Sequence, residues 1–296
     1  MSREIKHFAS FSTTKKIFNI AGIYDTIEQV RVKGFFNNIK NMKKIILVGL
    51  LLSVIPFFAF AQDADKNDFN NSREKEKELN LTKKRILYSP ELDKSIVVFP
   101  TVCYPKRENQ GLRKVLGSND YGWAKKVLDI GTGSGILGFI VLKNGAKNVV
   151  GTDINPAAVK NANHNAKVLG YANVFKARLV PKSRPQAYSV IGKDEKFDLI
   201  ISALPWIEAK PANMADYSRF DEGRVLLRSL IEGLRSHLAE NGKALISVSG
   251  QSVISLVFEL ASKYHLKATI VGRGLPATDG SSDFVTEECV IELTVI

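Results

Sequence analysis

The chain has 296 residues, of which 45% are hydrophobic and 24% are charged. This is the composition of an ordinary globular protein, and the length fits one large domain or two small ones. Lys and Arg outnumber Asp and Glu by 42 to 30, and residues 1–61 carry nine of these basic residues against three acidic ones. Cys103 and Cys289 form no CxxC pair and lie near no histidine cluster, which argues against a metal site.

An apolar, uncharged run covers residues 45–61 and follows Met42-Lys43-Lys44. A short basic stretch, an apolar run and the small-x-small end Ala59-Phe60-Ala61 are typical of a secretory signal peptide. The run is slightly shorter than the roughly 20 residues that span a bilayer, so a membrane anchor stays open, as does a buried helix. We therefore expect residues 42–61 to be a signal peptide or a membrane anchor, with an exported or membrane-anchored protein as the result and a cytoplasmic one as the alternative.

Two further segments surround this run. Residues 1–41 form a basic N-terminal extension, which is a start-site extension if Met42 is the true start, or else a targeting tail. Residues 62–84 are polar and charged with few large apolar side chains, so they cannot bury enough surface to fold alone and are expected to be a linker. The folded domain is then expected to comprise residues 85–296.

Within this domain, apolar runs rich in β-branched residues alternate with segments of helical periodicity. Strands are expected at residues 125–130, 148–154, 174–180, 197–203, 243–249, 266–272 and 288–296. Helices are expected at residues 135–144, 155–170, 222–240 and 252–264. The alternation predicts an α/β fold with a mainly parallel sheet covered on both faces. The last two strands have no helix between them and should pair antiparallel, which gives seven strands with an antiparallel C-terminal strand.

The most informative motif is VLDIGTGSGILG, residues 127–138, in which a buried strand leads into a glycine-rich turn and a helix. Such a turn lets a ligand approach the backbone closely at a helix N-terminus. Gly133, Gly135 and Gly138 match the dinucleotide fingerprint GxGxxG. Asp129, however, precedes the loop where its carboxylate would oppose a pyrophosphate, and it suits a ligand with a cationic amino or sulfonium group.

With Asp129 two residues before Gly131-x-Gly133-x-Gly135, the chain resembles the class I S-adenosylmethionine-dependent methyltransferases. Asp153, at the end of the next strand, matches the acidic residue of their second motif, which accepts the cofactor's ribose hydroxyls. The resemblance implies a Rossmann-like doubly wound fold and S-adenosylmethionine as the cofactor. It also implies the cofactor-binding residues, namely Asp129, Gly131, Thr132, Gly133, Ser134, Gly135, Asp153 and Ile154.

A third motif, FDLIISALPW at residues 197–206, resembles the FDLIxSNPPW/Y sequence of the methyltransferase small-domain group. The family's asparagine and the following backbone carbonyl accept hydrogens from a planar amine or amide. Here Ala203 replaces that asparagine and Leu204 replaces the first proline, whereas Pro205 and Trp206 keep their positions. These four residues are the candidate catalytic segment, although Ala203 has no side-chain acceptor. Trp206 could stack a planar substrate or be a core aromatic at a strand end.

By this resemblance, the methyl acceptor is expected to be a nucleic-acid base or a protein side chain. Two alternatives stay open. An NAD(P)-dependent oxidoreductase would use the same glycine-rich sheet, but the sequence shows no hydride-handling residues for it. A non-catalytic cofactor- or RNA-binding relative would explain the altered third motif, and an exported enzyme would be cut off from cytosolic cofactor.

Overall fold

The computed structural model describes residues 82–103, 109–278 and 285–296. The segments expected at 1–41 and 42–61, and nearly all of 62–84, lie outside these residues. In the three described ranges, no helix is both long and apolar enough to cross a membrane.

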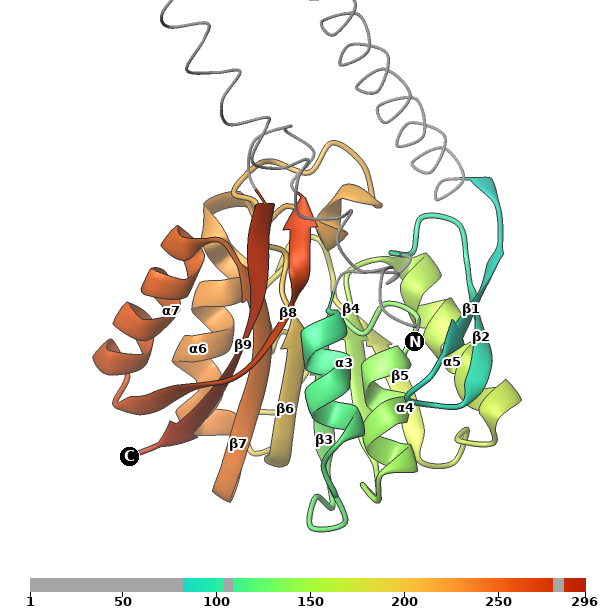
Figure 1. Cartoon of the computed structure of the whole chain (residues 1–296), viewed down its shortest axis with the longest axis horizontal. Helices are drawn as coiled ribbons and strands as arrows, with labels where there is room; N and C mark the ends of the chain where they lie inside the picture. The colour runs from blue at the N-terminus through green and yellow to red at the C-terminus, as the bar shows by residue number, and fades with distance from the viewer. Residues whose placement is uncertain (1–81, 104–108, 279–284) are drawn as a thin grey trace, which may run out of the picture. The chain divides into compact units, whose positions relative to one another are not determined.

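A seven-stranded sheet forms the centre of the fold, in the order β5-β4-β3-β6-β7-β9-β8 (Figure 1). Its first five strands in this order run parallel, and β9 pairs antiparallel with both β7 and β8. The prediction of a Rossmann-like, doubly wound sheet with an antiparallel C-terminal strand is therefore confirmed. The strands are β3 (Val127–Ile130), β4 (Val149–Asp153), β5 (Phe175–Leu179), β6 (Phe197–Ala203), β7 (Leu238–Ser249), β8 (Leu266–Thr278) and β9 (Val285–Val295).

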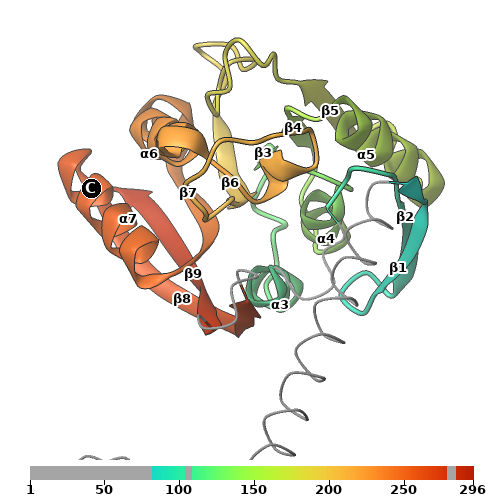
Figure 2. The same cartoon turned by 90° about the horizontal axis from the view of Figure 1, so that it is seen from above.

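Helices cover both faces of the sheet (Figure 2). One core lies between the sheet and α3, α4 and α5, and it includes Leu112, Phe139 and Ala162. The other lies between the sheet and α6 and α7, and it includes Leu230 and Val257. The helices are α3 (Gln110–Gly117), α4 (Ile136–Lys143), α5 (Pro156–Leu169), α6 (Val225–His237) and α7 (Gln251–Lys263), with short 3-10 turns η2 (Asp216–Ser218) and η3 (Glu222–Arg224). All four residues of β3 are buried, as expected for a strand covered on both faces.

The helix expected at residues 222–240 is shorter than predicted. Gly223 and Arg224 have φ of 64° and 57°, so the helix proper begins only at Val225. At its other end, Leu238 is already extended and pairs with Phe197 of β6. Its apolar spacing predicted the helix, but two consecutive left-handed residues and strand pairing set its ends.

Three elements at the start of the domain were not predicted. The strands β1 (Arg85–Ser89) and β2 (Lys94–Val98) form an antiparallel hairpin that is separate from the main sheet. The helix α3 follows this hairpin in the chain and packs mainly against β8. The helix α3 depends on a strand distant in sequence, which local periodicity does not reveal, whereas the two strands of the hairpin pair with each other across residues 90–93.

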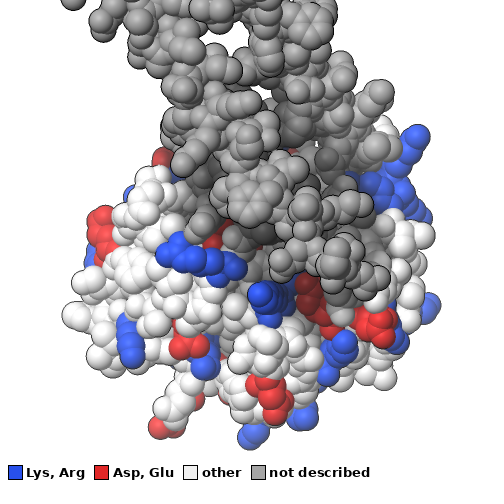
Figure 3. All heavy atoms as spheres, in the orientation of Figure 1, with Lys and Arg blue, Asp and Glu red and all other residues white. Residues whose placement is uncertain are grey.

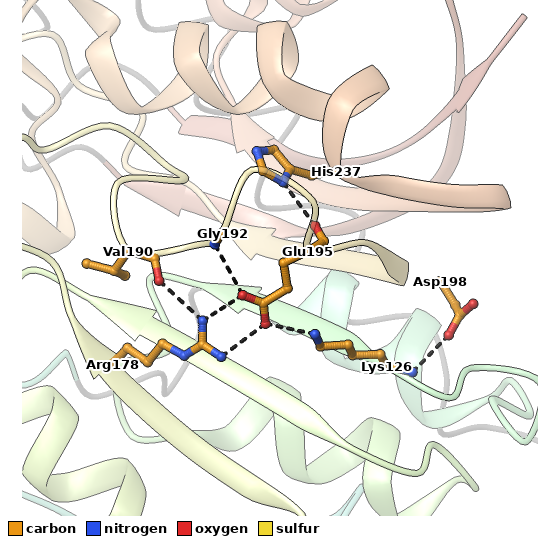
Figure 4. A network of polar contacts seen from close by, with 7 residues as sticks. All are labelled: Lys126, Arg178, Val190, Gly192, Glu195, Asp198 and His237. Atoms are coloured by element: carbon orange, nitrogen blue, oxygen red, sulfur yellow. Dashed lines mark hydrogen bonds and ion pairs between the residues drawn. The ribbon is translucent and has the colours of Figure 1, made fainter.

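A charged network ties the loop before β6 to β3 and β5 (Figure 4). The carboxylate of Glu195 accepts two hydrogen bonds from Arg178, at 2.9 and 3.0 Å, and pairs with the Lys126 ammonium at 2.8 Å. Asp198 accepts the backbone N–H groups of Lys125 and Lys126. The Arg178 hydrogen bonds are the main reason why the pKa of Glu195 falls to about 2.

Replacing Glu195 by glutamine should lower the free energy of unfolding at pH 7 by about 1–2 kcal/mol, because the two cations lose their counter-charge. The pKa of Glu195 is lowered on folding, so this stability is present above the ordinary carboxyl pKa. It is lost as the pH falls through about 2. Urea unfolding of both proteins at pH 7 and pH 3 measures the difference, which should shrink at pH 3. A matched change at the exposed Glu232 should have little effect at either pH.

Candidate cofactor-binding site

The glycine-rich loop joins β3 to α4 at the carboxyl end of the parallel strands. Gly131, Gly133 and Gly135 have φ of 71°, 55° and 89°, values that L side chains rarely adopt. A Cβ atom at Gly135 would also lie 2.5 Å from the ring of Phe139. The loop therefore depends on glycine for its backbone conformation, and at Gly135 for close packing as well.

Four N–H groups of this loop donate hydrogen bonds within the protein. Those of Gly131 and Thr132 donate to the Thr152 carbonyl at 2.8 and 2.9 Å, and that of Gly135 donates to the Thr132 carbonyl at 2.8 Å. The Gly133 N–H donates to the carboxylate of Asp153 at 2.9 Å. A pyrophosphate cradle relies on backbone N–H groups that point at the ligand, so this arrangement disfavours a dinucleotide.

Asp129 lies fully buried beneath the loop. Its Oδ2 accepts hydrogen bonds from the Thr132 hydroxyl at 2.6 Å and from the Gly138 N–H at 3.2 Å. Its Oδ1 is buried and has no hydrogen-bond partner among the described residues. Burial raises the pKa of Asp129 to about 7. The carboxylate thus shapes the loop directly and places a potential negative charge below it, which suits a cationic ligand.

Asp153 ends β4, the strand that pairs with β3, and is half-buried. Its Oδ1 accepts the Asn155 N–H at 2.8 Å, and its Oδ2 accepts the Gly133 N–H at 2.9 Å. Each carboxylate oxygen has a further lone pair, so both can still accept a hydroxyl hydrogen. The structure thus brings the predicted cofactor residues together around one loop: Thr132 and Ser134 are buried within it, and Ile154 follows Asp153 and is half-buried.

Cofactor affinity should depend on pH through these two carboxyl groups. Burial raises the pKa of Asp153 to about 6 and that of Asp129 to about 7. A cationic cofactor with ribose donors prefers both groups ionised, so binding at pH 5.5 should be about tenfold or more weaker than at pH 8. Titration of S-adenosylmethionine by calorimetry across this range measures the effect.

Cofactor affinity should rise with pH, whereas the free energy of unfolding of the ligand-free protein should fall. Because these two pKa values are raised on folding, the folded state holds extra protons between about pH 4 and pH 7, and stability falls as the pH rises through that range. Thermal unfolding of Asp129→Asn should show a flatter pH profile than the unaltered protein. If the two proteins had equal pH profiles of thermal unfolding, and if ligand binding did not depend on pH, the proposed titration of Asp129 and Asp153 would be wrong.

The candidate catalytic segment begins at the end of β6, next to the loop. Ala203 is half-buried and packs against the core under α3, α4 and α5, whereas Leu204 is buried in the core on the opposite face. The Leu204 N–H donates to the Ser247 carbonyl at 3.0 Å. Pro205 is also buried. Trp206 is partly buried and packs against the core under α6 and α7, as expected for a core aromatic at a strand end.

The acidic residues near this segment have structural partners. Glu208 pairs with Arg224 at 3.4 Å, and Asp221 accepts the N–H groups of Leu226 and Leu227 at the start of α6. Asp216 accepts hydrogen bonds from the turn before it.

Sequence reasoning missed the buried carboxylate of Glu288 in β9. Glu288 of β9 accepts the N–H groups of Gly111 and Leu112 at the start of α3, at 2.6 and 3.1 Å, and the Ser247 hydroxyl at 2.6 Å. Ser247 pairs in register with Ala203. A glutamate within the apolar run ECVIEL was the available signal, but its partners lie up to 177 residues away.

Across the described ranges, no group of three His, Cys, Asp or Glu side chains could hold a metal ion. Cys103 and Cys289 are not joined in a disulfide.

Comparison with known proteins places this site in a family. The family model described as ribosomal protein L11 methyltransferase matches residues 115–205. The ribosomal protein L11 methyltransferase of Lactobacillus johnsonii is 37% identical over 123 residues, which cover 41% of this chain and 30% of that protein. A putative protein N5-glutamine methyltransferase of Methanocaldococcus jannaschii is 33% identical over 158 residues, covering 49% of this chain and 75% of that protein.

A solved structure agrees on the fold. A putative methyltransferase complexed with S-adenosylhomocysteine aligns with a TM-score of 0.51 at 14% identity, covering 71% of this chain and 56% of that one. Together, the glycine-rich loop, the strand-end carboxylate and these relatives show that the chain belongs to the class I S-adenosylmethionine-dependent methyltransferases. The chain spans only 30% of the length of the Lactobacillus johnsonii relative, so its own activity is a separate question.

Proposed function

We propose that this protein transfers the methyl group of S-adenosylmethionine to a nitrogen of a protein side chain or a nucleic-acid base. The observation that carries the proposal is the loop around Gly131–Gly135 with Asp129 below it and Asp153 at its edge. Most N–H groups of this loop donate hydrogen bonds within the protein, and the charged side chains next to it are carboxylates. Both features suit a sulfonium cofactor better than a pyrophosphate, which weighs against the oxidoreductase alternative.

The residues present fit this cofactor. Asp153 would accept the ribose hydroxyls, Asp129 would provide the negative charge below the loop, and the glycines would allow close approach to the backbone. When bound, the cofactor supplies a methyl group on a sulfonium, which is already a good electrophile. The protein therefore has to orient the two reactants, and positioning alone can supply much of the rate.

On the acceptor side, the chain lacks the asparagine amide of the family motif. We propose that the backbone carbonyl at Ala203 or Leu204 orients the acceptor nitrogen and that Trp206 flanks it. Both relatives named above are protein methyltransferases by name, which favours a protein acceptor. On the described part of the face in Figure 3, basic and acidic side chains are interspersed, so this view gives no support for an extended nucleic-acid surface.

The experiment is a transfer assay with methyl-labelled S-adenosylmethionine and three acceptor pools: ribosomal and other cellular proteins, RNA, and small molecules. Label in the protein or RNA pool would support the proposal and identify the acceptor class. Cofactor binding without label in any pool would favour the second candidate, a non-catalytic relative. The absence of a side-chain acceptor at Ala203 is the observation that favours that candidate.

For the N-terminal part, we propose that residues 42–61 direct export or membrane insertion, with a mature chain beginning at Gln62 if the segment is cleaved. The proposal rests on the Met42-Lys43-Lys44 start and on the apolar run that ends at Ala61. A reporter fused after residue 70 should be exported or membrane-bound. Recovery of the whole protein from the cytosol, with residues 45–61 retained by mass, would contradict this expectation.

A further inference from the structure

Three buried asparagines, two on α5 and one at its N-cap, hold the chain that leaves the β1–β2 hairpin. Asn161 accepts the Phe99 N–H at 2.8 Å and donates to the Val97 carbonyl at 2.8 Å. Asn155, which also caps α5, donates to the Thr101 carbonyl at 3.0 Å. On the side that faces α5, the segment from Val97 to Thr101 has these side-chain hydrogen bonds in place of a neighbouring strand.

Asn165 extends the row to the glycine-rich loop. Its Oδ1 accepts the Val97 N–H at 3.1 Å, and its Nδ2 donates to the Val97 carbonyl at 2.8 Å. The same Nδ2 donates to the Ser134 carbonyl at 2.9 Å, inside the loop. Asn165 is 1% exposed, so water does not compete for these bonds. One amide group therefore joins the hairpin and the loop.

The far end of the segment is linked through Asn155 to Asp153. Asn155 binds Thr101 through its side chain, while its backbone N–H donates to Asp153. Thr101 has a φ of 64°, which is unfavourable for a β-branched residue and persists only where the surroundings enforce it. The hairpin is thus fixed at two points that both adjoin the predicted cofactor residues.

We propose that Asn165 is a positioning residue for the cofactor loop and that it couples cofactor binding to the β1–β2 hairpin. The inference rests on the proposed cofactor site. Ser134 lies between two left-handed glycines, so its carbonyl direction depends on an external donor, and Asn165 is that donor. By reciprocity, ordering of the loop by ligand must also order the hairpin end that shares the same amide.

Asn165→Leu tests the positioning role, and Asn161→Leu is its matched control. Both changes remove hairpin hydrogen bonds from a buried position on α5, but only the first removes the bond to the loop. Calorimetry with S-adenosylhomocysteine on the full chain should show binding weakened about threefold to tenfold by Asn165→Leu and less than about twofold by Asn161→Leu. Equal losses in the two variants would overturn the proposal.

Hydrogen exchange in the unaltered protein tests the coupling without any substitution. Adding S-adenosylhomocysteine should slow exchange at the Val97 and Phe99 N–H groups, which bind Asn165 and Asn161 rather than the loop. Protection confined to the loop would overturn the coupling while leaving the cofactor site intact. A complete absence of binding would instead reject the proposed function, and the inference with it.

Discussion

Replacing Asp153 by alanine should weaken S-adenosylhomocysteine binding by tenfold or more. The ribose hydroxyls lose their charged acceptor, and charge-assisted hydrogen bonds are worth about 1.5–3 kcal/mol each. The change also releases the N–H groups of Gly133 and Asn155, which Asp153 holds at 2.9 and 2.8 Å. The loop therefore loses one of its own supports together with the ligand contact.

Asp153→Asn is the comparison variant, because it keeps the side-chain shape and one carbonyl oxygen while it removes the charge and the acceptor for one of the two backbone N–H groups. We expect an intermediate loss of affinity, with thermal unfolding used to confirm that both variants are folded. Unchanged binding in the alanine variant would reject Asp153 as the ribose acceptor.

Restoring the family's acceptor in Ala203→Asn with Leu204→Pro should raise transfer to a planar amine or amide. A hydrogen bond made mainly in the transition state is worth about 10²–10³-fold at sites of this kind. Ala203 is half-buried at the end of β6, where an amide side chain would extend from the strand end. The gain should be measured as label transferred per unit time at saturating cofactor.

The Leu204→Pro substitution removes a backbone hydrogen bond that is present in the structure. The Leu204 N–H donates to the Ser247 carbonyl at 3.0 Å, and proline removes this donor. Ala203→Asn alone is therefore the necessary comparison, and cofactor affinity must be measured in both variants. Strong activity of the unaltered protein on such acceptors, with no gain in either variant, would show that a backbone carbonyl suffices.

The sequence was most informative where function depends on local backbone conformation. Gly131, Gly133 and Gly135 predicted the loop because only glycine adopts their φ values easily. The helix expected from residue 155 begins as α5 at Pro156, and the Asn155 side chain accepts the Ala157 N–H as a helix cap. These features depend on residues that are adjacent in the sequence.

Contacts between distant segments were not predictable in this way. Glu288 stabilises the N-terminus of α3 across 177 residues, and Asn165 joins Val97 to Ser134 across 68 and 31 residues. In the sequence, a buried glutamate or asparagine cannot be distinguished from an exposed polar residue. Its hydrogen-bond partners are backbone groups, which leave no sequence pattern. The helix α3 was missed for the same reason, because it packs against β8.

Calorimetry of the purified chain with S-adenosylhomocysteine and, separately, with NAD tests the central claim most directly. The loop N–H groups already donated to Thr152, Thr132 and Asp153, together with the acidic groups around the loop, predict saturable one-to-one binding of S-adenosylhomocysteine and none of NAD. Binding of NAD in preference to S-adenosylhomocysteine would contradict the account of the site.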